Sequence, residues 1–263
     1  MDEAVEVFRQ NANDLQVRIL DVVLAFFKKN QSLKGNMSTL SKINKELKKL
    51  ITPEKFKAPV KEFLRYFDKV ERTTLDELAK YNDIDFSKLD LSAERQLAIE
   101  EISLGLLNDD MLEQNMRLPL KKILYRHITT GITIDKAETE LKSFILTDKD
   151  SLGFAEKYVK TIAQETLLRY DGMINQKAAV EFGMDGFRFV GSNIKTTEPQ
   201  CRQMTEFNGE LGKLAINGKY AVEDLPEIVR ILKRDFDGVN KNLDPSNYFI
   251  YRNHWGCRHQ VIP

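Results

Sequence analysis

The feature that most constrains this fold is the spacing of apolar residues in the first third of the chain. In the first segment they recur at alternating steps of three and four residues: Val5, Phe8, Ala12, Leu15, Ile19, Val22 and Phe26. This spacing places them on one narrow stripe of an α-helix that packs against another helix. The pattern returns at Leu40, Ile43, Leu47 and Leu50, and again at Val60, Phe63, Phe67 and Val70. Residues 1–82 are therefore predicted to form a helical bundle.

A second helical region is predicted over residues 92–182. Residues 82–91 are polar and lack periodicity, which is typical of a linker, and Ser92 can cap the helix that follows. Helices are then expected from 93 to about 115, from about 119, from 135 to about 146, and from 154 to about 174. Thr133 is the expected cap of the third, and Gly172 is a candidate kink in the last.

The texture of the sequence changes at residue 183. Residues 187–191 alternate as a half-buried strand does, and residues 248–251 and 260–262 are two further β-prone runs. Residues 226–233 carry the one short helical pattern in this part. The predicted fold class is therefore mainly α: a helical bundle body followed by a small C-terminal α+β module over residues 183–263.

The distribution of charge says more than its total. Forty Lys and Arg balance 40 Asp and Glu, so the totals indicate neither a nucleic-acid-binding protein nor an enzyme with acidic substrates. Residues 31–69, however, carry ten basic against four acidic residues, and residues 70–115 carry twelve acidic against four basic ones. Solvated helix faces explain both stretches. The alternative is a nucleic-acid interface on the basic one, formed by Lys42, Lys45, Lys48 and Lys49.

The sequence predicts no membrane association. Its first residues are acidic and helical, unlike a secretory signal, and the longest apolar stretch, residues 22–27, is too short to span a bilayer. Only Cys201 and Cys257 are present, so no disulfide framework is implied. A reducing compartment is expected, with the cysteines as metal ligands or free thiols.

One cluster of residues can carry metal chemistry. His254 and His259 flank Cys257 near the end of the chain, and Cys201 lies in an earlier loop. Two thiols and two imidazoles are the ligand set of a closed tetrahedral zinc site. With all four positions filled by protein, such a zinc ion would be structural rather than catalytic. The alternative, two unrelated cysteines with nearby histidines, remains open, because short Cys/His clusters often give false positives.

Catalytic readings fit the sequence less well. Cys257 with a neighbouring histidine could be a nucleophile and base of a hydrolase, but side chains two or three residues apart in a turn seldom hold attack geometry, and no orienting acid is identifiable. There is no glycine-rich phosphate loop and no His-Glu-x-x-His motif. His127, among apolar helix residues, fits the edge of a core. The protein is therefore predicted not to be an enzyme, and no small-molecule substrate is expected.

The C-terminal half resembles a known family. Residues 158–170 followed by Phe187-Arg188-Phe189-Val190 resemble the helix and aromatic strand of phage Mu F-type minor head (head morphogenesis) proteins. The loop around Cys201 up to Gly209 occupies the place of the family's cysteine loop. The segment His254-Trp255-Gly256-Cys257-Arg258-His259 resembles its terminal His-Pro-x-Cys-Arg-Cys signature.

The match covers about residues 120 to 263, with three departures from the pattern. Met204 stands where the family often has a second cysteine, His259 replaces the last cysteine, and Trp255 replaces proline. The exchange of cysteine for histidine keeps a zinc ligand, whereas Met204 leaves Cys201 as the only ligand from its loop.

The resemblance implies a minor capsid protein in the head interior or at the portal vertex of a tailed phage. It implies contacts with portal, scaffold or major capsid protein and with packaged DNA, a role in head assembly or DNA delivery, and location in the virion after assembly in the host cytoplasm. The alternative is a zinc-stabilised nucleic-acid-binding protein.

Overall fold

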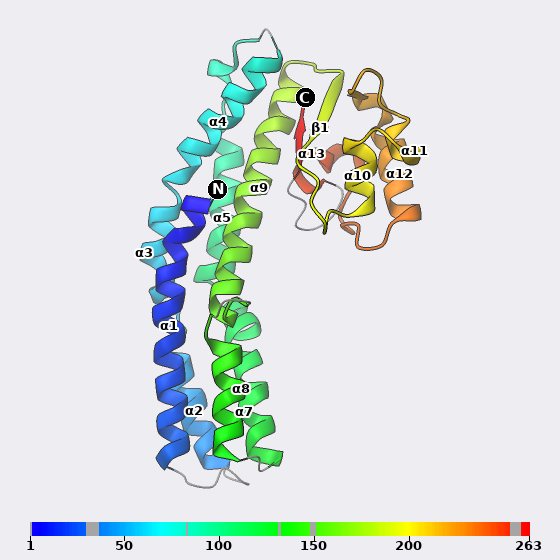
Figure 1. The fold of residues 1–263 in the computed structure, drawn as a ribbon. Coiled ribbons are helices and arrows are strands. Elements are labelled where there is room, and N and C mark those ends of the chain that lie inside the picture. Colours follow the sequence, from blue (N-terminus) through cyan, green and yellow to red (C-terminus); the bar gives the residue numbers. More distant parts are fainter. Residues whose placement is uncertain (1, 30–36, 83, 131–132, 148–150, 253–258) are drawn as a thin grey trace. The chain divides into compact units, whose positions relative to one another are not determined.

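The computed structural model describes residues 2–29, 37–82, 84–130, 133–147, 151–252 and 259–263. The protein is mainly helical, and a small antiparallel sheet of three strands lies near the C-terminus (Figure 1). The predicted fold class is confirmed to this extent. Within the described residues, none of the helices combines the length and apolar character that crossing a bilayer requires.

Helices occupy most of the first two thirds of the chain. They are α1 (Asp2–Lys29), α2 (Met37–Leu50), α3 (Glu54–Phe63), α4 (Tyr66–Tyr81), α5 (Ser92–Leu107), α6 (Asp109–Leu112), α7 (Leu118–Thr130), α8 (Ile134–Ile145) and α9 (Phe154–Glu181). The last third holds β1 (Gly186–Val190), α10 (Pro199–Thr205), α11 (Gly209–Gly212), β2 (Tyr220–Ala221), α12 (Leu225–Asp235), α13 (Tyr248–Tyr251) and β3 (Gln260–Ile262).

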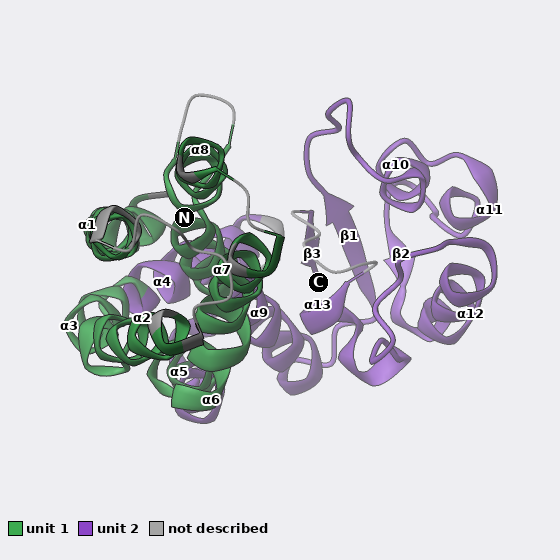
Figure 2. Ribbon diagram, turned by 90° about the horizontal axis from the view of Figure 1, so that it is seen from below, with its two compact units in different colours: residues 1–66, 99–164 green, residues 67–98, 165–263 purple. Residues whose placement is uncertain are grey.

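The chain forms two compact units that are not continuous in sequence (Figure 2). Unit 1 comprises residues 1–66 and 99–164, and unit 2 comprises residues 67–98 and 165–263. The helices α5 and α9 each contribute residues to both units. The three regions predicted from the sequence, 1–82, 92–182 and 183–263, are each continuous in the chain and so do not coincide with these units.

In unit 1, α1 packs against three helices, α2, α3 and α8. Its buried stripe is therefore wider than the predicted narrow seam, because each partner covers a different part of its surface. The buried residues are Ala4, Val5, Phe8, Ala12, Leu15, Gln16, Ile19, Leu20 and Val23. Val22, expected in the seam, is only half-buried, and Val23 takes the core position. This is the 3.6-residue period of a globular helix rather than that of a two-stranded coiled coil.

His127 joins α7 to α8. Its ring is fully buried, and its Nε2 lies 2.8 Å from Glu140 Oε2. The hydrogen bond with His127, aided by the positive charge of Arg126, holds the pKa of the Glu140 carboxyl below its ordinary value. The predicted core-edge histidine is thus a fully buried one with a carboxylate partner.

A pH dependence follows from this pair. A carboxyl whose pKa is lower in the folded than in the unfolded chain stabilises the fold above its unfolded pKa, about 4.3, and this stabilisation is lost as the pH falls through the folded pKa. Wild type is therefore expected to lose more thermal stability than Glu140→Gln between about pH 5 and pH 3. Thermal unfolding followed by circular dichroism at each pH measures this, and parallel losses in the two proteins would contradict it.

In unit 2, α9 packs against α4 and α5 through an aromatic and charged cluster. The rings of Phe67 and Tyr170 lie 4.7 Å apart, and the Tyr170 hydroxyl donates to Glu71. Arg95 Nη1 lies 3.2 Å from the same carboxylate. Burial and the adjacent Glu71 carboxylate raise the pKa of Tyr170. The phenol therefore stays a hydrogen-bond donor in this contact.

The predicted linker at residues 82–91 is a packed segment of unit 2. Phe86, Leu89 and Leu91 are buried, and the Phe86 ring meets that of Phe182 edge to face at 5.0 Å. The polar composition of the segment concealed these three apolar anchors. Phe86, Leu89 and Leu91 therefore belong to the core of unit 2, and residues 84–91 are packed against it.

The sheet has the strand order β2-β1-β3, with both pairings antiparallel. Phe187 pairs with Tyr220 in β2, and Phe189 pairs with Val261 in β3. The strands predicted at 187–191 and 260–262 are thus confirmed. The strand predicted at 248–251 is wrong: these residues form α13. A capping box between Asp244 and Asn247 begins this helical stretch, and it buries Tyr248 and Phe249 in the core beside β1.

Gly172 lies inside the continuous helix α9, where it allows a close contact. A Cβ atom at this position would lie 2.4 Å from the carbonyl oxygen of Phe249 in α13. Although alanine favours a helix over glycine by about 1 kcal/mol, overpacking against backbone costs about 1–3 kcal/mol. We therefore expect Gly172→Ala to destabilise the protein, as measured by urea denaturation. Val180→Ala, at an exposed site of the same helix, is the control; a more stable Gly172→Ala variant would refute this role.

Candidate functional site

Two of the four predicted metal ligands, Cys201 and His259, lie in the described part of unit 2. His259 directly precedes β3 and is 6% exposed. Its ring stacks on Phe189 of β1, with the ring centroids 5.2 Å apart. Gly191 makes room for it, because a Cβ atom there would lie 2.4 Å from His259 Cδ2. The imidazole is therefore fixed against the end of the central strand.

Cys201 lies in the first turns of α10 and is fully buried. It belongs to the same hydrophobic cluster as Phe189 and Val261, and Pro199 occupies the first helical position, where its missing N–H is tolerated. Cys201 belongs to the cluster and His259 stacks on its member Phe189, so a buried thiol and a buried imidazole, fifty-eight residues apart in sequence, lie in one module.

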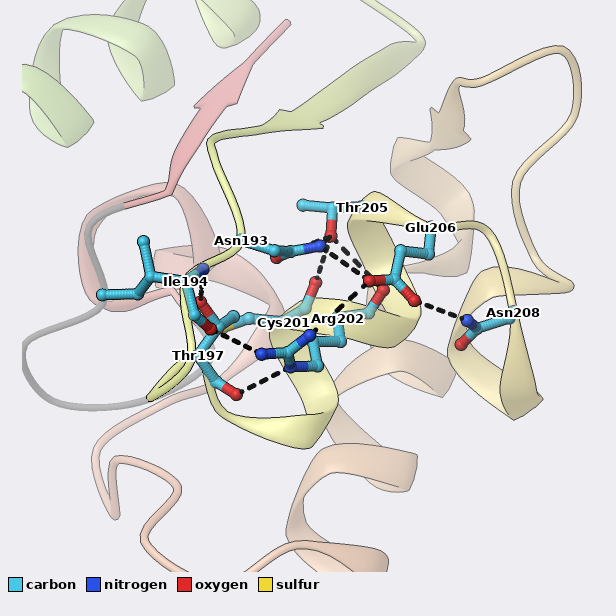
Figure 3. Close-up of polar contacts among 8 residues, drawn as sticks. All are labelled: Asn193, Ile194, Thr197, Cys201, Arg202, Thr205, Glu206 and Asn208. Carbon is cyan, nitrogen blue, oxygen red and sulfur yellow. Dashed lines mark hydrogen bonds and ion pairs between the residues drawn. The ribbon is translucent and has the colours of Figure 1, made fainter.

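A polar network fixes the loop that carries Cys201 (Figure 3). The guanidinium of Arg202 donates to the carbonyl oxygens of Ile194 and Thr197 and so closes the turn before α10. On the other side, Asn193 Nδ2 donates to Thr205 Oγ1 at 2.8 Å and to Glu206 Oε1 at 2.9 Å. Thr205 in turn donates to the Cys201 carbonyl at 3.0 Å. Thr205 thus binds the Cys201 carbonyl, and Arg202 fixes the turn that precedes α10.

Met204, which stands at the family's second cysteine position, has a core role. It is fully buried, its sulfur accepts a hydrogen bond from Tyr248 at 3.2 Å, and its carbonyl oxygen accepts one from Tyr220 at 2.9 Å. Burial raises the pKa of the Tyr220 phenol, which keeps it a donor. The thioether therefore fills space and accepts a hydrogen bond where a ligand would be expected.

The other two predicted ligands, His254 and Cys257, lie outside the described residues. Within the described ranges, no three or more His, Cys, Asp or Glu side chains come together as a metal site would require. Thiolate and neutral imidazole are both ligands that zinc accepts, so the described pair is half of a tetrahedral set. The zinc site stays a prediction.

An ion pair that the sequence analysis did not find anchors the chain just before this segment. Arg252 Nη2 lies 2.7 Å from Asp171 Oδ2 and 3.1 Å from the Leu168 carbonyl oxygen, and Thr74 donates to the other carboxylate oxygen at 2.9 Å. Arg252 and Asp171 are 2% and 5% exposed. Asp171, a charged residue on the buried face of α9, could have indicated this pair from the sequence, because buried charges are usually paired.

The backbone of Arg252 is strained as well. Its φ of 57° and ψ of −161° fall in a region that is essentially restricted to glycine. Such a conformation costs about 1–3 kcal/mol and persists only where the surroundings determine it. The buried ion pair supplies that constraint.

The candidate nucleic-acid interface lies on the surface of unit 1. Lys42, Lys45, Lys48 and Lys49 are all exposed on α2, opposite the buried stripe of Leu40, Ile43 and Leu47. Lys49 Nζ pairs with Glu46 at 2.7 Å. Lys48 and Lys49 also lie in the last turn, where positive charge complements the helix dipole. The lysines can thus reach a phosphate backbone, and they also stabilise their own helix.

Comparison with known proteins gives no match: no family, no curated protein and no solved structure shows significant similarity to the chain.

Proposed function

We propose that this protein is a structural component of a tailed-phage head, of the Mu F-type minor head class. It acts in the head interior or at the portal vertex, contacts the portal, scaffold or major capsid protein, and assists head assembly or the packaging and delivery of DNA. One observation carries the proposal beyond the resemblance in sequence. Two of the segments that resemble the family, the aromatic strand and the loop around Cys201, meet in one core, because Phe187 and Cys201 belong to the same buried cluster, which also holds Val261 of β3.

In this proposal a structural zinc ion locks the C-terminal module through Cys201, His254, Cys257 and His259. The chemistry of the donor set supports it, since Cys201 in the core cluster and His259, stacked on Phe189 of that cluster, offer a thiol and an imidazole in one module. A metal bridging α10 and β3 would join segments that are far apart in the chain. Such a crosslink stabilises a small module whose apolar core is limited.

Metal analysis tests the zinc site. We expect about one equivalent of zinc in the purified wild type and its loss in Cys201→Ser and His259→Ala. His127→Gln is the matched control, because His127 is a buried histidine of unit 1 that is no predicted ligand. Chelator should increase proteolysis of residues 183–263 and spare the N-terminal helices. Wild type without zinc would remove the metal from the proposal.

Particle composition tests the role in the head. Proheads and mature particles, purified after expression of the genome that encodes the chain, are compared by quantitative mass spectrometry. Peptides of this protein are expected at a constant low ratio to the major capsid protein. Absence from both kinds of particle would overturn the assignment, whatever the zinc content.

The second candidate is a zinc-stabilised nucleic-acid-binding protein, favoured by the exposure of the α2 lysines. It requires duplex DNA binding that weakens with salt, and neutralising Lys45, Lys48 and Lys49 should lower the salt slope by about 3. Neutralising Lys136, Lys142 and Lys157, which are exposed outside the basic stretch, is the matched control. No binding at low salt would exclude this function.

A further inference from the structure

A cavity of about 320 Å³ opens in unit 1 between the first turns of α1 and the first turns of α9. Its lining residues are Val5, Glu6, Arg9, Leu152, Glu156, Val159 and Lys160. The volume is at the lower end of the range for small-molecule sites. Neither the zinc site nor the proposed role in a phage head uses these residues.

The rear wall of the cavity is fixed by hydrogen bonds. Glu156 is 3% exposed. One oxygen of its carboxylate forms an ion pair with Arg9 Nε at 3.1 Å, and the other accepts a hydrogen bond from the Thr147 hydroxyl. The amide N–H of Glu156 donates to Gln16 Oε1 at 3.0 Å, and that of Gly153 donates to Thr147 at 3.0 Å. The wall is therefore preorganised, and both oxygens of its buried carboxylate are occupied.

The cationic groups of the lining have capacity left for a ligand. Within the described ranges, Lys160 forms no ion pair. The guanidinium of Arg9 pairs with Glu156 through Nε. Its contact with Glu6 is weak, because Nη1 lies 3.4 Å from the Glu6 carboxylate, at the long limit of a hydrogen bond. Since each oxygen of Glu156 already has a partner, the cationic groups open to a ligand are the Lys160 ammonium and the outer end of Arg9. Both attract an anion.

The rest of the lining is aliphatic. Val5 and Val159 are 8% and 1% exposed and form the inner apolar surface, and Leu152, 36% exposed, stands at the mouth. A short alkyl chain can cover this surface while a charged head stays beside Lys160 and Arg9. We propose that the cavity binds a small anion with a short aliphatic chain, whose headgroup is a carboxylate or a phosphate.

Glu6 allows binding of an anion to be distinguished from binding of a cation. It is a lining carboxylate, its side chain is 63% exposed, and it contacts Arg9 from the solvent side. An anionic ligand must compete with it for the guanidinium. Neutralising Glu6 should therefore strengthen binding, whereas neutralising Lys160 should weaken it. A cationic ligand would respond in the opposite way.

The test is an NMR titration of the full chain with hexanoate, hexyl phosphate and hexylammonium. Shift changes at the methyl groups of Leu152 and Val159 report on the cavity. We expect dissociation constants on the order of 1 mM for the anions, as suits ligands of this size, and none measurable for hexylammonium. The two anion arms identify the headgroup that the site prefers.

Three variants and one control complete the experiment. Affinity should fall about tenfold in Lys160→Gln, rise about threefold in Glu6→Gln, and vanish in Leu152→Trp, which fills the mouth. Lys157→Gln, an exposed lysine of the same helix that does not line the cavity, should leave it unchanged. No shifts with either anion, equal binding of hexylammonium, or a Lys160→Gln variant that binds like wild type would each overturn the proposal.

Discussion

Replacing Asp171 with alanine is expected to lower the free energy of unfolding of unit 2 by about 3–5 kcal/mol, because it leaves the buried guanidinium of Arg252 without its carboxylate. Thr74 loses the acceptor of its hydroxyl in the same variant. The strained backbone of Arg252 then has one constraint fewer. The unpaired guanidinium, the lost hydrogen bond of Thr74 and the less constrained backbone of Arg252 thus all lower the stability of this one variant.

Urea denaturation, combined with hydrogen exchange of the β1 amides, measures this loss. Glu210→Ala is the control, because it breaks the ion pair between Arg234 and Glu210, whose side chains are 44% and 54% exposed. Exposed pairs contribute about 0–1 kcal/mol. A double variant, Asp171→Leu with Arg252→Met, should recover much of the loss, since removing both charges relieves the desolvation penalty. Equal effects of Asp171→Ala and Glu210→Ala would show that the buried pair does not stabilise the fold.

The second large effect is expected for Phe187→Ala, at about 3–5 kcal/mol. Phe187 is 1% exposed in β1, the central strand, and its ring lies 5.5 Å from Tyr220, 5.6 Å from Tyr248 and 5.5 Å from Phe249. These rings come from β2 and α13, so a cavity here separates the strand from both neighbours. Lost transfer energy, lost aromatic contacts and the cavity all act in the same direction.

Phe207→Ala is the matched control for this prediction. The same substitution is made in the same unit, but Phe207 is 48% exposed and its ring centroid lies 6.4 Å from that of Tyr220. It should cost much less than Phe187→Ala in the same denaturation assay. A comparable loss in the two variants would mean that Phe187 is not the centre of the core.

The sequence predicted elements whose signals are local. The helices over residues 135–146 and 226–233 appear as α8 and α12, and Thr133 caps α8 as expected. β1 and β3 follow from alternation and β-prone composition. The dipeptide Asn217-Gly218 is also a hairpin signal: with φ of 53° and 75° it forms the tight turn that leads into β2, a strand that the sequence analysis did not predict.

The errors arose where distant contacts outweighed local preference. Residues 248–251 have β-prone side chains, yet the Asp244 cap and the burial of Tyr248 and Phe249 make them helical. The zinc prediction used residue types at suitable spacing, of which only Cys201 and His259 fall within the described structure. The cavity lined by Arg9 and Lys160 had no sequence signal, because its two walls come from segments about 150 residues apart.

The sequence by itself determined most of the longer helices and the strands β1 and β3, because periodicity and capping act over a few neighbouring residues. Only the tertiary structure decided that α1 is covered by three helices, that Phe86, Leu89 and Leu91 belong to a core, and that Arg252 reaches Asp171 across eighty-one positions. Such contacts depend on how whole elements pack, and a buried charge is stable only where its partner arrives.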